Sequence, residues 1–438
     1  MTKEQYSEFQ SFHINQFPVH LCSTEKYKTN QIALYIRQPI EEENHTKVSL
    51  IPSVLRRGTV EYPTSQKIRQ ALDQLYGASL YSDVMKRGEE QVIVFRLEVP
   101  NEKYLSDRTP LFEKAMQLLS QILFHPLLEN GTFSEKYVEL EKDLLKRKLS
   151  QIIDDKIRYA NKRCTEEMFS EERFRLNASG SEEQIPHITS KDLYEYYQKM
   201  LASHPMELFV VGDLAKDEVE GVVRKHFSFK NRTELIKMPE TKVQVEVKKE
   251  KVIIEKTKIQ QGKLHIGCRT NTSFQSDDYI PLVVCNGVFG GYAHSKLFRN
   301  VREKESLAYY VSSSIESHKG FMMIMSGVEP TNYEKTVKII KDQLNEMVQG
   351  NISEEEIAQT KAIIINQMKE SNDLPVQLME RYFHGIVGGV KRKTEEVIAQ
   401  IEAVTKEQIQ RVAQKIEIDT IYFLTSNNDL PEEEGKKI

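Results

Sequence analysis

Hydrophobic and polar positions follow two different periods along this chain, and each period occurs in both halves. Residues 91–99 alternate between two faces, as a β-strand does, and residues 31–37 and 206–211 have similar strand character. Apolar residues at helical spacing follow Thr64, which is a predicted N-cap, and Gly77 ends that helix. Longer amphipathic helices are predicted over residues 111–123, 133–153, 189–201 and 214–226.

A charged stretch from residue 230 to about 250 lacks helical periodicity and is predicted to be a linker. Val243, Val245 and Val247 alternate within it, which leaves open an early strand. The same order of elements then returns, with strands at 251–255, 263–268, up to 328 and 420–424, and helices at 332–348, 354–369 and from 405.

Short sequence motifs also recur in the two halves, which indicates an internal repeat. The matching positions are Ile51-Pro52 with Ile280-Pro281, Ser134 with Ser353, Thr189 with Thr405, and Asp213-Leu214 with Asp429-Leu430. We therefore predict an α+β protein of two similar domains, 1–229 and 230–438. A repeat of this kind indicates the fold of the protein but not the reaction that it catalyses.

Composition narrows the functional classes. The chain has 61 basic and 65 acidic residues, a formal net charge of −4, which argues against broad nucleic-acid binding. The sequence holds no long apolar run and begins with a polar stretch, so we expect no membrane span and no signal peptide. Its four cysteines form no C-x-x-C pair, and a reduced cytoplasm is the simplest compartment.

The most distinctive sequence motif lies in residues 289–310. It reads F-G-G-Y-A-H-S-K-L-F-R-N-V-R-E-K-E-S-L-A-Y-Y, which predicts a glycine loop, a short helix capped by Ser295, and a strand. The stretch resembles the second half of the insulinase/pitrilysin peptidases, the inverzincins, whose pattern is a glycine pair followed by S-x-L-F-x-x-V-R-E-K-x-x-L-A-Y. The order of elements agrees over nearly the whole chain.

This resemblance implies a fold and two site residues. The fold would be two homologous α/β-sandwich domains of the mitochondrial processing peptidase/LuxS-like metallohydrolase type. In the family, the arginine of this pattern binds the substrate backbone and the tyrosine donates a hydrogen bond to the developing oxyanion. These residues correspond to Arg302 and Tyr309. Taken without the resemblance, Arg302 is read as part of a solvated helix face and Tyr309 as a core residue.

The family's zinc site is degenerate in this sequence. Inverzincins bind zinc through H-x-x-E-H and a later glutamate, and no H-x-x-E-H occurs here. Alignment on Gly58-Thr59 puts Ser49 and Ser53 at the two histidines, Pro52 at the general base and Lys148 at the third ligand. Proline cannot accept a proton, and beyond a first turn it is expected to interrupt a helix. A lysine ammonium about 4 Å from a divalent ion would cost on the order of 8 kcal/mol at an effective dielectric of roughly 20. We expect no metal in this chain.

Other chemistries have less support. His45, Ser49 and Ser53 suggest a serine hydrolase, but no G-x-S-x-G elbow or orienting acid is evident, and surface or buried hydroxyls are the simpler interpretation. Residues 287–291 lack the G-K-[ST] ending of a phosphate-binding loop.

The resemblance therefore implies a zinc-less peptidase subunit. Two-chain members pair one subunit that carries zinc with one that carries only the arginine and tyrosine. Wording such as Arg57-Gly58-Thr59 and Lys86-Arg87-Gly88-Glu89 is closest to a bacterial subgroup of zinc-less subunits, which family knowledge links to modification of elongation factor P.

Three interpretations follow, and the sequence leaves them open. In the first, the chain lacks a complete active site and forms a heterodimer with a zinc-bearing paralogue, or a homodimer, that acts on a peptide or small unfolded protein. In the second, it is a non-enzymatic peptide-binding or structural member of the family. The third is a self-sufficient enzyme of unrecognised chemistry.

Overall fold

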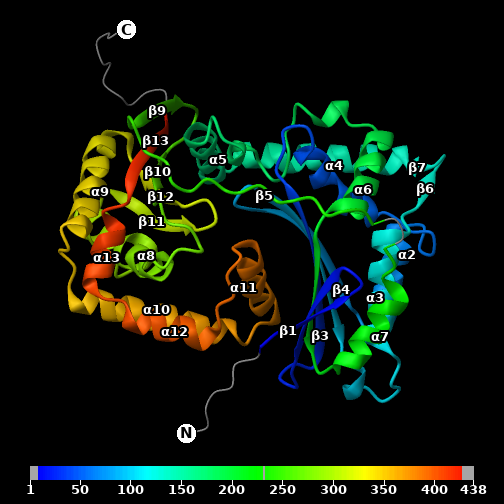
Figure 1. Ribbon diagram of the computed structural model, residues 1–438. Helices are drawn as coiled ribbons and strands as arrows, with labels where there is room; N and C mark the ends of the chain where they lie inside the picture. Colours follow the sequence, from blue (N-terminus) through cyan, green and yellow to red (C-terminus); the bar gives the residue numbers. More distant parts are fainter. Residues whose placement is uncertain (1–7, 230–231, 427–438) are drawn as a thin grey trace. The chain divides into compact units, whose positions relative to one another are not determined.

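The computed structural model describes residues 8–229 and 232–426, and these form two compact units (Figure 1). Unit 1 contains residues up to 151 together with 176–240 and 372–384, and unit 2 contains 152–175, 241–371 and the remainder. The units differ from the predicted contiguous halves because each half contributes one segment to the other unit. The predicted boundary at 229/230 lies beside residues 230 and 231, which are outside the described residues.

Unit 1 is built on a six-stranded mixed sheet with the order β1-β2-β8-β3-β5-β4. Its central strand β3 pairs antiparallel with both β5 and β8, whereas β2 and β8 are parallel. The strand bounds are Gln10–Ile14 (β1), Phe17–Ser23 (β2), Thr29–Pro39 (β3), Ser79–Arg87 (β4), Glu90–Pro100 (β5) and Met206–Gly212 (β8).

Unit 2 has a five-stranded sheet with the order β11-β12-β10-β13-β9. Read from the opposite end, the sheet of unit 1 has this same order of strands along the chain plus the extra strand β1, and the corresponding pairs β2–β8 and β9–β13 are both parallel. The bounds are Lys251–Lys256 (β9), Gly262–Arg269 (β10), Ala308–Glu316 (β11), Phe321–Val328 (β12) and Glu417–Thr425 (β13). The prediction of an α+β protein with a repeated architecture is confirmed.

Helices flank both sheets (Figure 1). In unit 1 they are α1 (His45–Leu55), α2 (Ser65–Gln74), α3 (Leu111–Phe124), α4 (Glu135–Asp154, mostly in this unit), α6 (Ser190–Ser203), α7 (Lys216–His226) and most of α11 (Pro375–Val387); the hairpin Leu128–Glu129 (β6) and Thr132–Phe133 (β7) is also there. In unit 2 they are α5 (Lys156–Met168), α8 (Tyr279–Asn286), α9 (Tyr333–Val348), α10 (Glu354–Ser371), α12 (Thr394–Ala403) and α13 (Lys406–Ala413). None of the helices among the described residues has the length and apolarity needed to cross a bilayer.

Helix starts were predicted better than some local details. Thr189 and Thr405 both cap helices, accepting from the backbone N–H of Asp192 and Gln408. The matched prolines differ, however, since Pro52 is the eighth residue of α1 and Pro281 the third of α8. Their places within the two assigned helices therefore differ, and the structural equivalence of the two prolines stays a prediction. Of the matched pair Asp213-Leu214 and Asp429-Leu430, the second lies outside the described residues.

One further local prediction is corrected, and one open alternative is decided. The glycine pair is helical, because Gly287–Gly291 continues α8 as a π-helical turn, and a second π-helical stretch follows at Phe298–Lys304. Residues 241–250 contain no strand. The backbone N–H of Val245 instead donates to Asn271 Oδ1 at 3.0 Å, and that of Val247 to Glu417 Oε2 at 3.1 Å. The linker is thereby held against unit 2.

The segment that the first half contributes to unit 2 is held by a buried ion network. Helix α5 packs on β10 and β13, and Glu172 follows it. One oxygen of Glu172 accepts from Arg269 Nη2 at 2.8 Å, and the other lies 2.6 Å from Lys319 Nζ. Arg269 is 3% exposed and Lys319 is fully buried, and Arg269 also contacts Asp419 at 2.8 Å. Burial acts to raise the pKa of Glu172, but the two cations outweigh it and hold the pKa below its usual value.

The reciprocal segment in unit 1 is held in the same manner. Glu380 on α11 accepts from Tyr35 Oη at 2.9 Å and forms ion pairs with Arg87, at 3.1 Å, and Arg96. The next turn of α11 adds Phe383, whose ring stacks on Tyr35 with centroids 4.1 Å apart. Each exchanged segment therefore supplies one carboxylate to two cations of the unit that receives it.

We predict that Glu172→Gln destabilises unit 2 by about 3 kcal/mol, because the buried cations Arg269 and Lys319 lose the carboxylate that they share. Urea unfolding of wild type and variant measures the loss. The matched control is Glu305→Gln, which breaks an exposed pair with Lys335 and should cost much less stability. Equal losses for the two variants would show that Glu172 does not anchor the segment.

A buried histidine makes unit 2 sensitive to acid. His265 lies in the central strand β10 with no exposed surface, and neither ring nitrogen has a hydrogen-bond partner among the described residues. Burial lowers the pKa of His265 to about 3, and Lys263 adds to the effect. The unfolded chain, with a pKa of about 6.5, binds a proton that the folded chain rejects. Stability is therefore highest above about pH 6.5 and falls on acidification until about pH 3.

We expect His265→Leu to remove this part of the pH dependence. Between pH 7 and pH 5 the free energy of unfolding of the wild type should fall by about 2 kcal/mol more than that of the variant. Denaturant titrations of both proteins at the two pH values test this. Parallel falls would mean that His265 is protonated in the folded state or is not buried.

Candidate functional site

The positions predicted for the degenerate metal site lie on and near helix α1, which packs against β4 and β5. Ser49 and Ser53 lie one turn apart on it, both half-buried. The Ser49 hydroxyl donates to the backbone carbonyl of Thr46 at 2.8 Å, so it is used within the helix. Pro52 is buried inside α1, and the helix runs through it, so the expectation that the proline interrupts the helix is wrong.

Fixed positive charges surround this helix end. Arg57 forms an ion pair with Glu141 of α4, and Arg56 Nη1 donates to Ser82 Oγ at 3.1 Å. Lys148, exposed on α4, lies 4.0 Å from Asp83 of β4. Burial lowers the pKa of Arg56, and Arg57 adds to this effect while Glu141 opposes it.

These contacts bring α1, α4 and β4 together with three cations and two carboxylates. An inverzincin would need a divalent cation here, which the cations repel. Among the residues that the structure describes, no group of three or more His, Cys, Asp and Glu side chains could hold a metal ion. The four cysteines, all buried, are free thiols.

The arginine and tyrosine of the glycine stretch lie at the surface of unit 2. Arg302 belongs to the π-helical stretch Phe298–Lys304 and is exposed, with its guanidinium 4.6 Å from the centroid of the Phe298 ring. Tyr309 is 65% exposed, so the alternative of a core tyrosine is wrong. A backbone hydrogen bond from Leu307 to Val301, 3.0 Å, joins the helix end to the following strand.

Tyr309 is the extra residue of a β-bulge. In the ladder between β11 and β12, Ala308 pairs with Val328 and Tyr310 with Gly327, so Tyr309 has no opposite residue. Bulges of this kind re-aim a side chain. The Tyr309 hydroxyl donates to Glu329 Oε1 at 3.3 Å. Within the described ranges 8–229 and 232–426, β11 is an edge strand, so one side of its backbone carries no neighbouring strand of its sheet.

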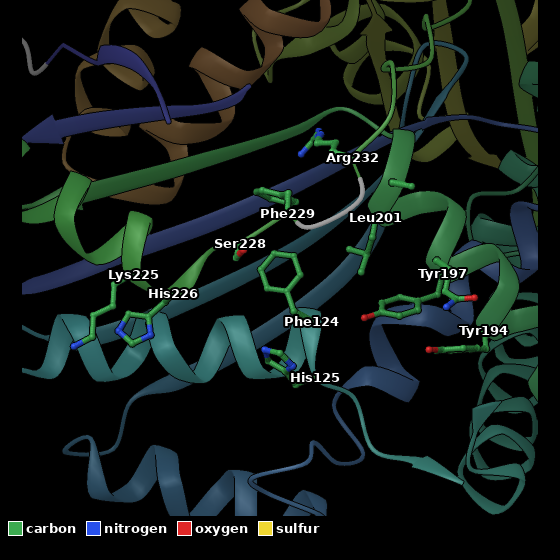
Figure 2. A pocket seen from close by; sticks show the side chains of 12 residues that line it. Phe124, His125, Tyr194, Tyr197, Leu201, Lys225, His226, Ser228, Phe229 and Arg232 are labelled. Atoms are coloured by element: carbon green, nitrogen blue, oxygen red, sulfur yellow. The ribbon is translucent and has the colours of Figure 1, made fainter. Parts of the chain in front are cut away.

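A pocket that the sequence did not predict lies in unit 1 (Figure 2). It has a volume of about 430 Å³ and is lined from α3, α6 and the end of α7. Its walls are aromatic, including Phe124 and Phe229, and Lys225 and His226 at its edge share the carboxylate of Glu113. A substrate bound at Lys225 and His226 would have to compete with Glu113 for these two side chains. None of the predicted site residues lines the pocket.

Comparison with known proteins identifies the family. A family model described as Peptidase M16 inactive domain matches residues 187–364, which include Arg302 and Tyr309. The chain is 44% identical over 405 residues to a Bacillus subtilis protein named probable inactive metalloprotease YmfF, covering 92% of this chain and 95% of that one.

Solved structures agree with this assignment. A conserved protein from Enterococcus faecalis has a TM-score of 0.90 at 32% identity, covering 97% of this chain and all of that one. A peptidase M16 inactive domain from Pseudomonas fluorescens has a TM-score of 0.79 at 17% identity, with the same coverage, which supports the fold alone. The resemblance to the insulinase-type peptidases is confirmed: the chain belongs to the M16 peptidase family, as an inactive metalloprotease homologue.

Proposed function

We propose that this chain is the zinc-less subunit of a two-chain M16 peptidase and contributes Arg302 and Tyr309 to a substrate held at the zinc of a paralogous subunit. The observation that supports the proposal most is the exposure of both residues at the bulged start of an edge strand. A tyrosine in the domain core could not reach a substrate held by another chain.

The geometry suits work on an extended peptide. An edge strand can pair with a peptide backbone, and Arg302 and Tyr309 flank the start of β11. The guanidinium offers donors to peptide carbonyls, and the tyrosine hydroxyl offers one donor to an oxyanion. In the free chain that hydroxyl donates to Glu329, and an oxyanion would take the place of this carboxylate.

The same proposal also covers the location of the zinc, the assembly and the substrate. The zinc would belong to the partner, because cations occupy the corresponding region of this chain. The assembly would be a heterodimer with the zinc-bearing paralogue, or a homodimer that only binds peptide. The substrate would be a peptide or small unfolded protein in the cytoplasm, with neither nucleic acid nor membrane involved.

A second candidate is a non-enzymatic peptide-binding or structural member of the family. The edge strand β11 favours this function equally, because strand pairing needs no zinc. The two candidates differ in whether Arg302 and Tyr309 affect turnover in the presence of a zinc-bearing partner.

Restoring the metal ligands tests the degenerate site. We expect the combined variant Ser49→His, Pro52→Glu, Ser53→His and Lys148→Glu to bind about one zinc per chain, because it supplies two imidazoles and a carboxylate and removes one cation. Metal analysis after dialysis against zinc measures this, with wild type as the zinc-free control. Stoichiometric zinc bound by wild type in unit 1 would contradict the proposal.

Substitution of the exposed pair tests function in trans. In a reconstituted complex with a zinc-bearing relative from the same cell, Tyr309→Phe should lower turnover by about 10²–10³-fold because one oxyanion donor is lost. Arg302→Ala should lower kcat/KM by about tenfold or more, because a charged donor is lost. A peptide library with mass-spectrometric detection measures both.

The matched control is Arg299→Ala, which removes an exposed arginine from the same π-helical stretch and should leave turnover unchanged. Complex formation and partner zinc content should be the same for all variants. Full activity with both Arg302 and Tyr309 replaced would defeat the peptidase-subunit proposal in favour of the binding function. Lost assembly would instead assign the two residues an architectural role.

A further inference from the structure

Three chemically active side chains form a row across the sheet of unit 1, on strands β1, β2 and β8. Ser11 and His20 are directly opposite in the antiparallel ladder of β1 and β2, and Glu207 lies on the neighbouring strand. Ser11 Oγ is 2.8 Å from His20 Nδ1, and His20 Nε2 is 2.8 Å from Glu207 Oε2. His20 and Glu207 are 5% and 8% exposed, whereas Ser11 is exposed.

The direction of each hydrogen bond follows from the groups involved. An ionised carboxylate only accepts, so Nε2 of a neutral His20 carries the hydrogen and donates it to Glu207. Nδ1 is then an acceptor, and the Ser11 hydroxyl donates to it. Arg37 and Arg232 both interact electrostatically with Glu207. The imidazole is thereby oriented as a base for the serine.

A fourth group, Tyr382 of α11, completes the arrangement. Its hydroxyl is 2.7 Å from Ser11 Oγ. Its ring packs against Phe9, His20 and Phe209, with centroids 4.9, 5.2 and 5.8 Å away, so the hydroxyl is held beside the serine. A phenol in this position can donate to an oxyanion that forms on a carbon attacked by Ser11.

We propose that Ser11 is the nucleophile of an acyl-transfer centre that hydrolyses carboxylic esters, with His20 as general base, Glu207 as its positioning residue and Tyr382 as oxyanion donor. The arrangement of nucleophile, base and orienting acid is that of a serine hydrolase, recognised by geometry and not by sequence order. This centre is independent of Arg302 and Tyr309.

The reaction balances with the groups present. Ser11 Oγ bonds to the ester carbonyl carbon and its proton passes to His20 Nδ1. The carbon–oxygen bond to the alcohol then breaks, and the alcohol leaves with that proton. Water attacks the acyl–Ser11 ester, gives its proton to Nδ1, and Ser11 recovers it on leaving, so ester and water yield acid and alcohol. One side-chain oxyanion donor suits an ester, whose leaving group is better than that of an amide.

A serine-directed fluorophosphonate probe tests the proposal on the full chain. We expect the folded protein to be labelled at Ser11, as located by peptide mass spectrometry, and Ser11→Ala to abolish that label. His20→Gln should slow labelling by about 10²-fold, the usual contribution of a general base. Ser203→Ala is the matched control, because the Ser203 hydroxyl donates to the Lys199 carbonyl at 3.0 Å and should leave labelling unchanged.

A pH profile separates activation from mere packing. Labelling of the wild type should rise with pH, as expected for attack assisted by a base, and Glu207→Gln should shift this rise, because the group that orients the imidazole is gone. Turnover of p-nitrophenyl acetate should depend on Ser11 in the same manner. Labelling that is equal in wild type and Ser11→Ala, or equal in urea-unfolded protein, would overturn the proposal, as would a profile that Glu207→Gln leaves in place.

Discussion

Each unit depends on a half-buried carboxylate that arrives from the other half of the chain. Glu172 joins Arg269 and Lys319 in unit 2, and Glu380 joins Arg87 and Arg96 in unit 1. Removing one partner of a buried ion pair costs several times more than an exposed pair contributes, because the remaining charge is uncompensated. Neither unit can therefore reach its final packing until the exchanged segment is in place, which couples the folding of the two halves of the sequence.

The exchanged segments also bring polar side chains close to residues of the sheets. In unit 1 the segment that brings Glu380 also brings Tyr382, whose ring covers His20 and whose hydroxyl reaches Ser11. In unit 2 the sheet presents β11 as an edge strand, and its bulge turns Tyr309 outward. Architecture that is repeated between the units thus supports different side chains in each, as expected when function resides in sites and not in folds.

The elements that could be predicted from the sequence are those whose own hydrophobic pattern is long and regular. Strands β3, β5, β8, β10 and β13 and helices α3, α4, α6, α9 and α10 have long periodic patterns, and their bounds were predicted to within a few residues. Helix α5 was missed because its buried stripe is only Ala160, Cys164 and Met168, one residue per turn in a polar helix. The row of Ser11, His20 and Glu207 could not be found from sequence, because it depends on the register of three strands. The exposure of Tyr309 depends on a bulge, which no local pattern signals.

The predicted metal site differs from that of a metalloenzyme in its electrostatics as well as in its missing ligands. A metalloenzyme that loses one ligand keeps a field suited to a cation, whereas here Arg56, Arg57 and Lys148 are drawn to the region by Glu141 and Asp83. Each carboxylate that could attract a divalent ion already has a cationic partner, so binding a metal would require breaking those pairs as well as supplying ligands. The positive charge that zinc would contribute is instead carried by the protein itself. A chain with this arrangement can keep the fold of a peptidase while its structure opposes the return of the metal.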